Sequence, residues 1–143
     1  MMVKHHLAGK IIFVSSYLGL MSLVGYSTYS PGQHALRGLA ETLRSELQLY
    51  DIGIHIFFPG IIYSPGYEEE NKTKPAVTLK IQEVDTGMTP EQSALSLLKG
   101  VQHGDFHITA DFLGNLFRTS TRGASPNNNF FLDGITSLVG NVR

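Results

Sequence analysis

Two short apolar runs and the helical stretch between them set the main pattern of this chain. Lys10–Ser15 and Gly53–Phe58 are continuous apolar runs rich in β-branched residues, which is typical of strands buried on both faces. From Tyr29 to about Tyr50, apolar residues recur every three or four positions, as in an amphipathic helix. Strand, helix and strand together predict a βαβ unit over residues 9–60, and therefore a parallel sheet with a right-handed crossover.

The pattern after residue 60 predicts a further helix and a further strand. Ile61–Lys74 is polar and is expected to be a loop, followed by a short helix at Pro75–Glu83. A capping box at Thr89 begins a helix that runs to about His103. The expected segments are a loop region at 61–85, a helix with the last strand (Asp105–Ala110) at 86–118, and a C-terminal tail at 119–143. We expect one domain, since 143 residues fit the usual size of about 100–200.

Charge and cysteine content narrow the classes of partner and chemistry. Eleven basic and twelve acidic residues give a net charge of −1, which argues against a nucleic-acid partner, because a phosphate backbone demands a basic surface. The chain has no cysteine, so it has no disulfide and no thiolate zinc site. His5 and His6 are adjacent and have no evident third ligand, so we expect no metal.

Membrane-spanning and secretory signals are not evident in the pattern. No apolar run reaches the roughly 18–20 residues that cross a bilayer, and Met1–Lys10 has no apolar core of a signal peptide. We therefore expect a cytosolic location. The apolar stretches Phe112–Phe117 and Phe130–Val139 are long enough only for peripheral contact with a membrane or for the lip of a lipid channel.

Hydroxyl-bearing residues cluster where the two predicted strands end. Ser15 and Ser16 close the first strand, Tyr29 stands at the start of the helix, and Pro59–Gly60 ends the second strand with Ser64 shortly after. In parallel α/β sheets, ligands bind beyond the carboxyl ends of the strands. A hydroxyl and a phenol at that edge can share a substrate carbonyl, one donating a hydrogen bond and the other a proton.

These residues lie within motifs that resemble a known family. The matching stretches are Ile12–Gly19, Gly25–Ser30, Ala35–Glu41, Phe58–Gly60 and Ser64–Pro75. Together they resemble the catalytic half of the short-chain dehydrogenases/reductases, and among these the 3-ketodihydrosphingosine reductases, especially the fungal ones. The last stretch, which ends in Thr-Lys-Pro, is the most specific. The resemblance covers about Gly9 to Arg118.

The resemblance implies a fold, a cofactor and roles for individual residues. It implies an α/β fold, the C-terminal half of a Rossmann-like, doubly wound parallel sheet in three αβα layers. Ser16 would orient the substrate carbonyl, with Ser15 as the alternative, and Tyr29 would protonate the oxygen as hydride arrives from NADPH. Residues 61–85 would be the substrate loop. The implied cofactor-binding residues are Tyr29, Gln33, Pro59, Gly60, Ile62 and Ser64.

Two departures from the family pattern bear on activity. The family has lysine four residues after its tyrosine, and Gln33 stands there, on the same helix face as Tyr29 but without the positive charge. No two glycines are separated by a single residue, so the Gly-x-Gly turn that receives the cofactor pyrophosphate does not occur. We therefore expect residues 1–143 to be a partial domain whose nucleotide-binding half is missing.

Two functions remain open from the sequence. The first is an NADPH-dependent reductase of a lipid-like ketone in sphingolipid synthesis, at the cytosolic face of the endoplasmic reticulum, with impaired or no activity in this chain because of Gln33 and the missing half. The second is a non-catalytic remnant or interaction module that docks on a full-length reductase. In either case helix 29–50 is the expected contact with a second copy or a related reductase, because the family uses this helix in its dimers.

Overall fold

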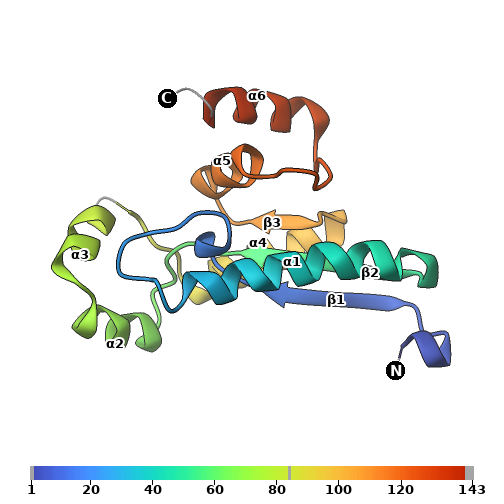
Figure 1. Cartoon of the computed structure of the whole chain (residues 1–143), viewed down its shortest axis with the longest axis horizontal. Helices are drawn as coiled ribbons and strands as arrows, with labels where there is room; N and C mark the ends of the chain where they lie inside the picture. The colour runs from blue at the N-terminus through green and yellow to red at the C-terminus, as the bar shows by residue number, and fades with distance from the viewer. Residues whose placement is uncertain (1, 84, 141–143) are drawn as a thin grey trace.

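A parallel sheet of three strands forms the centre of the molecule (Figure 1). The computed structural model describes residues 2–83 and 85–140. The strands are β1 (Gly9–Val14), β2 (Ile52–Phe58) and β3 (His107–Thr109), in the order β1-β2-β3. Gly9 lies opposite Ile52 and Ile56 lies opposite His107. The α/β class, the parallel βαβ unit and the third strand are therefore confirmed.

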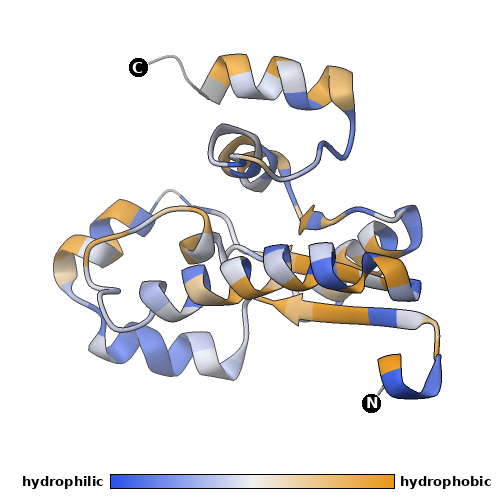
Figure 2. Cartoon of the chain, turned by 45° about the vertical axis from the view of Figure 1, so that its right-hand side comes forward, coloured by the Kyte–Doolittle hydropathy of each residue, from blue (hydrophilic) through white to orange (hydrophobic). Residues whose placement is uncertain are grey.

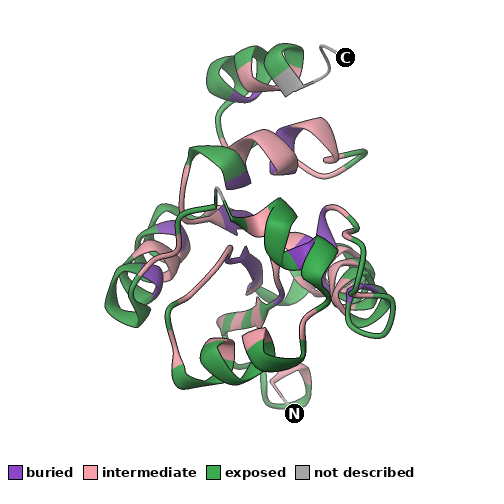
Figure 3. Ribbon diagram, turned by 90° about the vertical axis from the view of Figure 1, so that its left-hand side faces the viewer, coloured by how far each residue is buried: buried purple, intermediate pink, exposed green. Residues whose placement is uncertain are grey.

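Helices cover both faces of this sheet. Helix α1 (Ser30–Leu47) lies on one face, where the alternating side chains of β2 pack with its buried Ala40. Helix α4 (Pro90–His103) lies on the other face, where a Cβ on its Gly100 would stand 2.5 Å from the side chain of Ile108. The central strand is therefore the most buried element (Figure 3). The remaining elements are η1 (Val3–His5), η2 (Tyr17–Gly19), η3 (Gln48–Tyr50), α2 (Pro65–Thr73), α3 (Ala76–Gln82), α5 (Phe112–Ser120) and α6 (Phe130–Gly140).

Strand β1 is partly buried on one face and exposed on the other, which corrects the sequence prediction that both of its faces are buried. Ile11 and Phe13 pack against the core, whereas Ile12 and Val14 are 42% and 57% exposed. The other face of β1 is covered only in part, where the Nζ of Lys10 donates to the carbonyl of Val101 in α4. Within residues 2–83 and 85–140, β1 pairs with β2 alone, so its second edge is open.

The polar segment after β2 is also different from the prediction. Residues 65–73 form helix α2 instead of a loop. Ser64 caps this helix by accepting a hydrogen bond from the backbone N–H of Tyr67 at 3.3 Å, and Pro65 takes the first helical position. The acidic run Glu68–Glu70 is exposed on α2 and is not part of a loop. The same Ser/Thr-Pro start occurs at Thr89, where the predicted capping box is present.

Histidine 107 is a neutral aromatic residue in the core. It is fully buried, stacks on Phe106 at a centroid distance of 4.5 Å and meets Phe58 edge-on at 5.2 Å. Its Nε2 lies 3.6 Å from a carboxylate oxygen of Glu41, which is too long for a hydrogen bond. Burial, together with the positive charge of Arg37, lowers the pKa of His107 to about 3. The ring therefore carries no charge at neutral pH.

The C-terminal segment is held by a buried ion pair between α5 and α6. The guanidinium of Arg118 donates to both carboxylate oxygens of Asp133, at 3.0 and 2.5 Å. The two side chains are 4% and 3% exposed. Large apolar residues of helix α6 are exposed, and much of this helix has the colour of hydrophobic residues in Figure 2. No helix in the described part of the chain is both long and apolar enough to cross a membrane.

Candidate functional site

The carboxyl ends of β1 and β2 lie side by side and continue in parallel beyond the sheet. The backbone N–H of Ser15 donates to the carbonyl of Phe57 at 2.8 Å, and that of Tyr17 donates to the carbonyl of Pro59 at 3.0 Å. The serine pair and the Pro59–Gly60 turn are therefore neighbours. The structure brings these two groups of predicted site residues to one edge, as the sequence indicated.

The two serines differ in how their hydroxyls are used. Ser15 is buried, and its Oγ donates to the backbone carbonyl of Gln33 at 3.3 Å. Ser16 is half-buried, and its Oγ accepts a hydrogen bond from the backbone N–H of Leu18 at 3.2 Å, which caps η2. A hydroxyl that only accepts can still donate its own hydrogen. This arrangement favours Ser16 over Ser15 as the donor to a substrate carbonyl.

Tyr29 stands at the N-terminus of α1, next to the segment that contains Ser15 and Ser16, here called the serine segment. Its backbone N–H donates to the carbonyl of Tyr26 at 3.1 Å, and its side chain is 45% exposed. The next residue, Ser30, is buried and donates from its Oγ to the carbonyl of Leu18 at 2.8 Å. That bond fixes the start of α1 against η2, whose cap is Ser16. The phenol of Tyr29 and the hydroxyl of Ser16 therefore project from two segments that are joined directly.

Gln33 lies one helical turn after Tyr29 and has an unsatisfied acceptor. Its backbone N–H donates to the carbonyl of Tyr29 at 3.3 Å. Its side-chain oxygen Oε1 is buried and has no hydrogen-bond partner among residues 2–83 and 85–140. A buried amide oxygen without a donor is costly, and a sugar hydroxyl is a suitable donor. A ribose hydroxyl is one group that can satisfy this acceptor, whereas the positive charge of the family lysine is absent at this position.

The other predicted cofactor residues follow β2 in order. Pro59 is buried, and Gly60 is so close to Tyr17 that a Cβ there would lie 2.8 Å from the tyrosine ring. Ile62 is half-buried and forms a parallel bridge with Met88. Ser64 uses its Oγ to cap α2. The structure thus places Pro59 and Gly60 against the serine segment, and Ile62 and Ser64 further along the same connection.

Tyr17 and Asp111 are neighbours of the site that the sequence did not single out. The hydroxyl of Tyr17 donates to Asp111, whose carboxylate also accepts from the backbone N–H of Gly114 at 2.7 Å and so caps α5. Burial, together with this carboxylate, raises the pKa of Tyr17, so the phenol stays protonated. A Cβ on Gly114 would lie 2.5 Å from the Tyr17 hydroxyl. The residue directly after Ser16 is thereby tied to α5.

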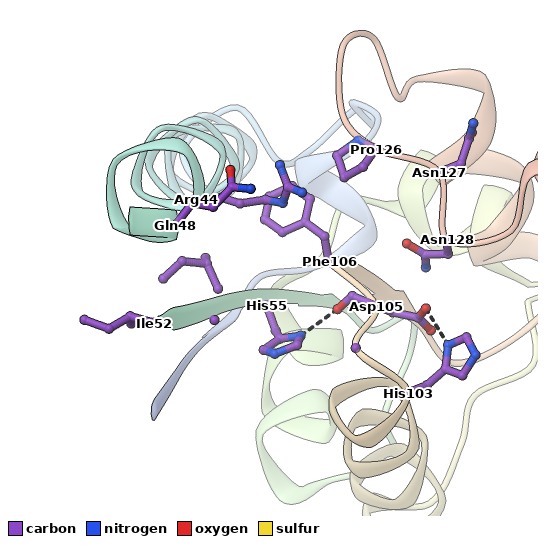
Figure 4. A pocket seen from close by; sticks show the side chains of 13 residues that line it. Arg44, Gln48, Ile52, His55, His103, Asp105, Phe106, Pro126, Asn127 and Asn128 are labelled. Carbon is purple, nitrogen blue, oxygen red and sulfur yellow. Dashed lines mark hydrogen bonds and ion pairs between the residues drawn. The ribbon is translucent and has the colours of Figure 1, made fainter. Parts of the chain in front are cut away.

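A polar cavity lies at the opposite edge of the sheet and is separate from these residues. It has a volume of about 330 Å³ and is lined by the start of β2, the turn before β3 and the end of α1. Figure 4 shows His55 bonded through Nδ1 to the carbonyl of Asp105, and His103 bonded to the carboxylate of Asp105. A second hollow, of about 770 Å³, opens beside the start of α1 and includes Tyr26 and Ser30.

The match to a family model agrees with the geometry of the sheet and its edge. A model described as short chain dehydrogenase matches residues 1–75, which is more than half of the chain. The protein therefore belongs to the short-chain dehydrogenase family. Within that family it is similar in particular to curated proteins named 3-ketodihydrosphingosine reductase.

Two of these curated relatives show how far the similarity extends. The 3-ketodihydrosphingosine reductase of Cryptococcus neoformans is 49% identical over 142 residues, which is 99% of this chain and 42% of the relative. The 3-dehydrosphinganine reductase of Danio rerio is 40% identical over 124 residues, or 87% of this chain and 37% of the relative. The chain thus spans about two fifths of the length of the relatives it matches.

Solved structures confirm the Rossmann-like fold. A short-chain dehydrogenase from Sphingobium yanoikuyae in complex with NADPH matches with a TM-score of 0.65, covering 99% of this chain and 48% of that chain. One from Burkholderia cenocepacia in complex with NADP matches with a TM-score of 0.63, covering 82% of this chain and 44% of that chain. The identities are 15% and 17%, so these likenesses show the fold alone.

Proposed function

We propose that this chain supplies the catalytic edge of an NADPH-dependent 3-ketodihydrosphingosine reductase. The observation that carries the proposal is the direct link between the segments of Ser16 and Tyr29 through the Ser30–Leu18 hydrogen bond. The 49% identity to the Cryptococcus neoformans relative supports the choice of substrate. The substrate is a ketone on a long alkyl chain, and the reaction converts it to an alcohol.

The residues at this edge act on the oxygen of the ketone. When bound, NADPH supplies the hydride that adds to the carbonyl carbon. Ser16 donates a hydrogen bond to the carbonyl oxygen and orients it, since within the described part of the chain its Oγ acts only as an acceptor. Tyr29 transfers its phenolic proton to that oxygen as negative charge develops there. Because the side chain of Tyr29 is 45% exposed, the phenolate can regain a proton from water.

We assign to this chain contacts with the nicotinamide and ribose part of the cofactor. The Oε1 of Gln33, which has no partner among the described residues, would accept a hydrogen bond from a ribose hydroxyl. The Pro59–Gly60 turn lies against the serine segment and forms the neighbouring wall. The pyrophosphate contacts would come from a glycine-rich turn, which the printed sequence lacks.

A chimera tests this function. The chain is assayed for NADPH binding and for reduction of 3-ketodihydrosphingosine, first alone and then joined to the nucleotide-binding half of the Cryptococcus neoformans relative. We expect NADPH oxidation that depends on the ketone only in the chimera. If the chimera binds NADPH but reduces no ketone, and the chain alone co-purifies with the full-length relative, the chain is an interaction module instead.

Restoring the family lysine is expected to raise the activity of that chimera. Gln33→Lys places a cation one helical turn from Tyr29. A cation near an acid typically lowers its pKa by about 1–3 units, at about 1.36 kcal/mol per unit. We therefore expect kcat to rise by about 10- to 1000-fold. The matched control is Gln33→Met, which adds no charge. Equal activities of the Lys and Met variants would contradict the proposed effect.

We also propose that the protein works at the cytosolic face of the endoplasmic reticulum, with α6 in peripheral contact with the membrane. Six large apolar residues of α6 are 56–80% exposed, whereas its Asp133 is turned inward to Arg118.

Liposome flotation tests this contact, and we expect the chain to float with the liposomes. Phe131→Glu with Leu138→Glu should reduce the bound fraction at least about ten-fold, because each side chain contributes about 1.5–3 kcal/mol when buried. Leu49→Glu, at an exposed position of η3, is the control; a chain that never floats contradicts the proposal.

A further inference from the structure

The side chain of Lys74 is buried, although lysine side chains are usually exposed. Its side chain is 2% exposed, and it stands between α2 and α3 in the Thr-Lys-Pro sequence. Its Nζ lies 3.0 Å from a carboxylate oxygen of Glu70 and donates to the side-chain oxygen of Gln82 at 2.9 Å. The same ammonium lies 4.7 Å from the ring centroid of Tyr67. Lys74 therefore joins the two helices of the α2–α3 segment.

The same cluster reaches the turn that precedes Tyr29. The ammonium of Lys74 lies 5.8 Å from the ring centroid of Tyr26, and the hydroxyl of Tyr26 donates to Glu70 at 2.5 Å. Burial opposes the charge on Lys74, but its interactions with Tyr26 and Glu70 outweigh this effect, so the pKa of Lys74 lies above its ordinary value. The lysine is thus a charged group held between a carboxylate and two aromatic rings.

A second contact docks α3 on the same turn. Thr78 is fully buried, and its Oγ1 donates to the carbonyl of Val24 at 2.9 Å. Gly25 has a φ of +92°, and a Cβ there would lie 2.5 Å from the Thr78 hydroxyl. The close approach of α3 therefore requires glycine in the turn. The Val24–Tyr26 turn is held by α2 and α3 at two independent points.

The Val24–Tyr26 turn also determines where helix α1 begins. The carbonyl of Tyr26 accepts from the backbone N–H groups of Tyr29 and Ser30, at 3.1 and 2.9 Å, and the rings of Tyr26 and Tyr29 are 6.0 Å apart. We propose that Lys74 is a positioning residue, which docks the α2–α3 segment on the Val24–Tyr26 turn and so fixes the placement of Tyr29. The effect on catalysis rests on the proposed function; the docking does not.

Hydrogen exchange of the intact chain tests the docking directly. In Lys74→Met we expect amides in residues 22–30 and 65–82 to exchange at least about ten-fold faster, with β2 and α4 unchanged. Lys72→Met is the matched control, because Lys72 is 64% exposed and its ion pair, with Glu69, lies on the surface of α2; it should change neither segment. Faster exchange confined to 65–82, a uniform increase over the whole chain, or no change would each overturn the proposal.

A second variant, Tyr26→Phe, tests the same docking contact if Lys74→Met does not fold. Tyr26→Phe removes only the hydroxyl that donates to Glu70, and the same two segments should respond. In the active chimera, Lys74→Met should lower kcat at least about ten-fold with an unchanged KM for NADPH, since a misplacement of about 1 Å can cost about 10²-fold. A chimera without activity refutes the proposed function, while the exchange result still decides the docking. An active chimera whose kcat does not respond to Lys74→Met overturns the positioning role.

Discussion

Replacing Tyr29 by phenylalanine is expected to lower the kcat of the chimeric reductase by about 10²- to 10⁴-fold, the usual contribution of a positioned general acid. The substitution removes only the hydroxyl, so the ring contact with Tyr26 at 6.0 Å remains. The KM for NADPH should change far less than kcat, because Gln33 and the Pro59–Gly60 segment, which are also implied cofactor contacts, are untouched. Initial rates of NADPH oxidation with 3-ketodihydrosphingosine measure both quantities.

The control for this experiment is Tyr50→Phe. Tyr50 is 47% exposed, nearly the same as Tyr29, and it lies beyond the far end of α1 in η3. It therefore reports the effect of losing an exposed phenol away from the site. If the Tyr29→Phe chimera kept its activity, another acid would have to protonate the substrate, and the role given to Tyr29 would be wrong.

The part of the fold that depends on local pattern could be predicted from the sequence. The buried strand β2 and the amphipathic helix α1 both follow from apolar spacing, because each buries one continuous stripe or run against the other. The predicted helix over 29–50 is α1 followed by the 3-10 turn η3, a difference of a few residues at its ends. The helix at Thr89 was marked by its capping box.

The sequence predictions for β1 and for residues 65–73 were wrong because burial at these positions depends on distant segments. The composition of β1 predicted burial on both faces, but Ile12 and Val14 are exposed because no helix of the described residues covers that part of the sheet. Apolar pattern cannot show whether a covering element is present. Helix α2 was missed because its residues are nearly all polar; only the Ser64–Pro65 start marked it.

The sequence predicted which segments form the candidate site, but not the side-chain contacts that hold these segments in place. Ser16 and Tyr29 lie on segments that meet, as the position of strand ends in a parallel sheet indicates, while their chemical roles stay predictions. The Tyr17–Asp111 and Lys74–Glu70 contacts join residues through side chains, which spacing does not reveal. Thr-Lys-Pro was evident as a motif, but its lysine could not be assigned a partner without the structure.

Breaking the buried pair of Arg118 and Asp133 is expected to have the largest effect on stability. Arg118→Met leaves the Asp133 carboxylate buried without its partner, and such a loss typically costs about 3–5 kcal/mol. The double variant Arg118→Met with Asp133→Leu should recover most of this loss, because it removes both charges. Urea unfolding followed by circular dichroism gives the free energies.

The pH dependence of the penalty distinguishes an isolated charge from a simple packing defect. Burial opposes ionisation of Asp133, but Arg118 outweighs it and holds the pKa of this carboxyl below its usual value. The pair therefore stabilises the fold above the ordinary aspartate pKa of about 4, and this contribution is lost as the pH falls through the lowered pKa. In Arg118→Met the carboxyl can escape its unpaired charge by taking up a proton, so the penalty should shrink between pH 7 and pH 4. Lys72→Met is the control, because it breaks the exposed pair with Glu69; it should lower the free energy of unfolding by no more than about 1 kcal/mol at either pH.

The loss of unfolding free energy in Arg118→Met could instead be equally small, or independent of pH. Either result would mean that the ion pair does not hold α6 to α5.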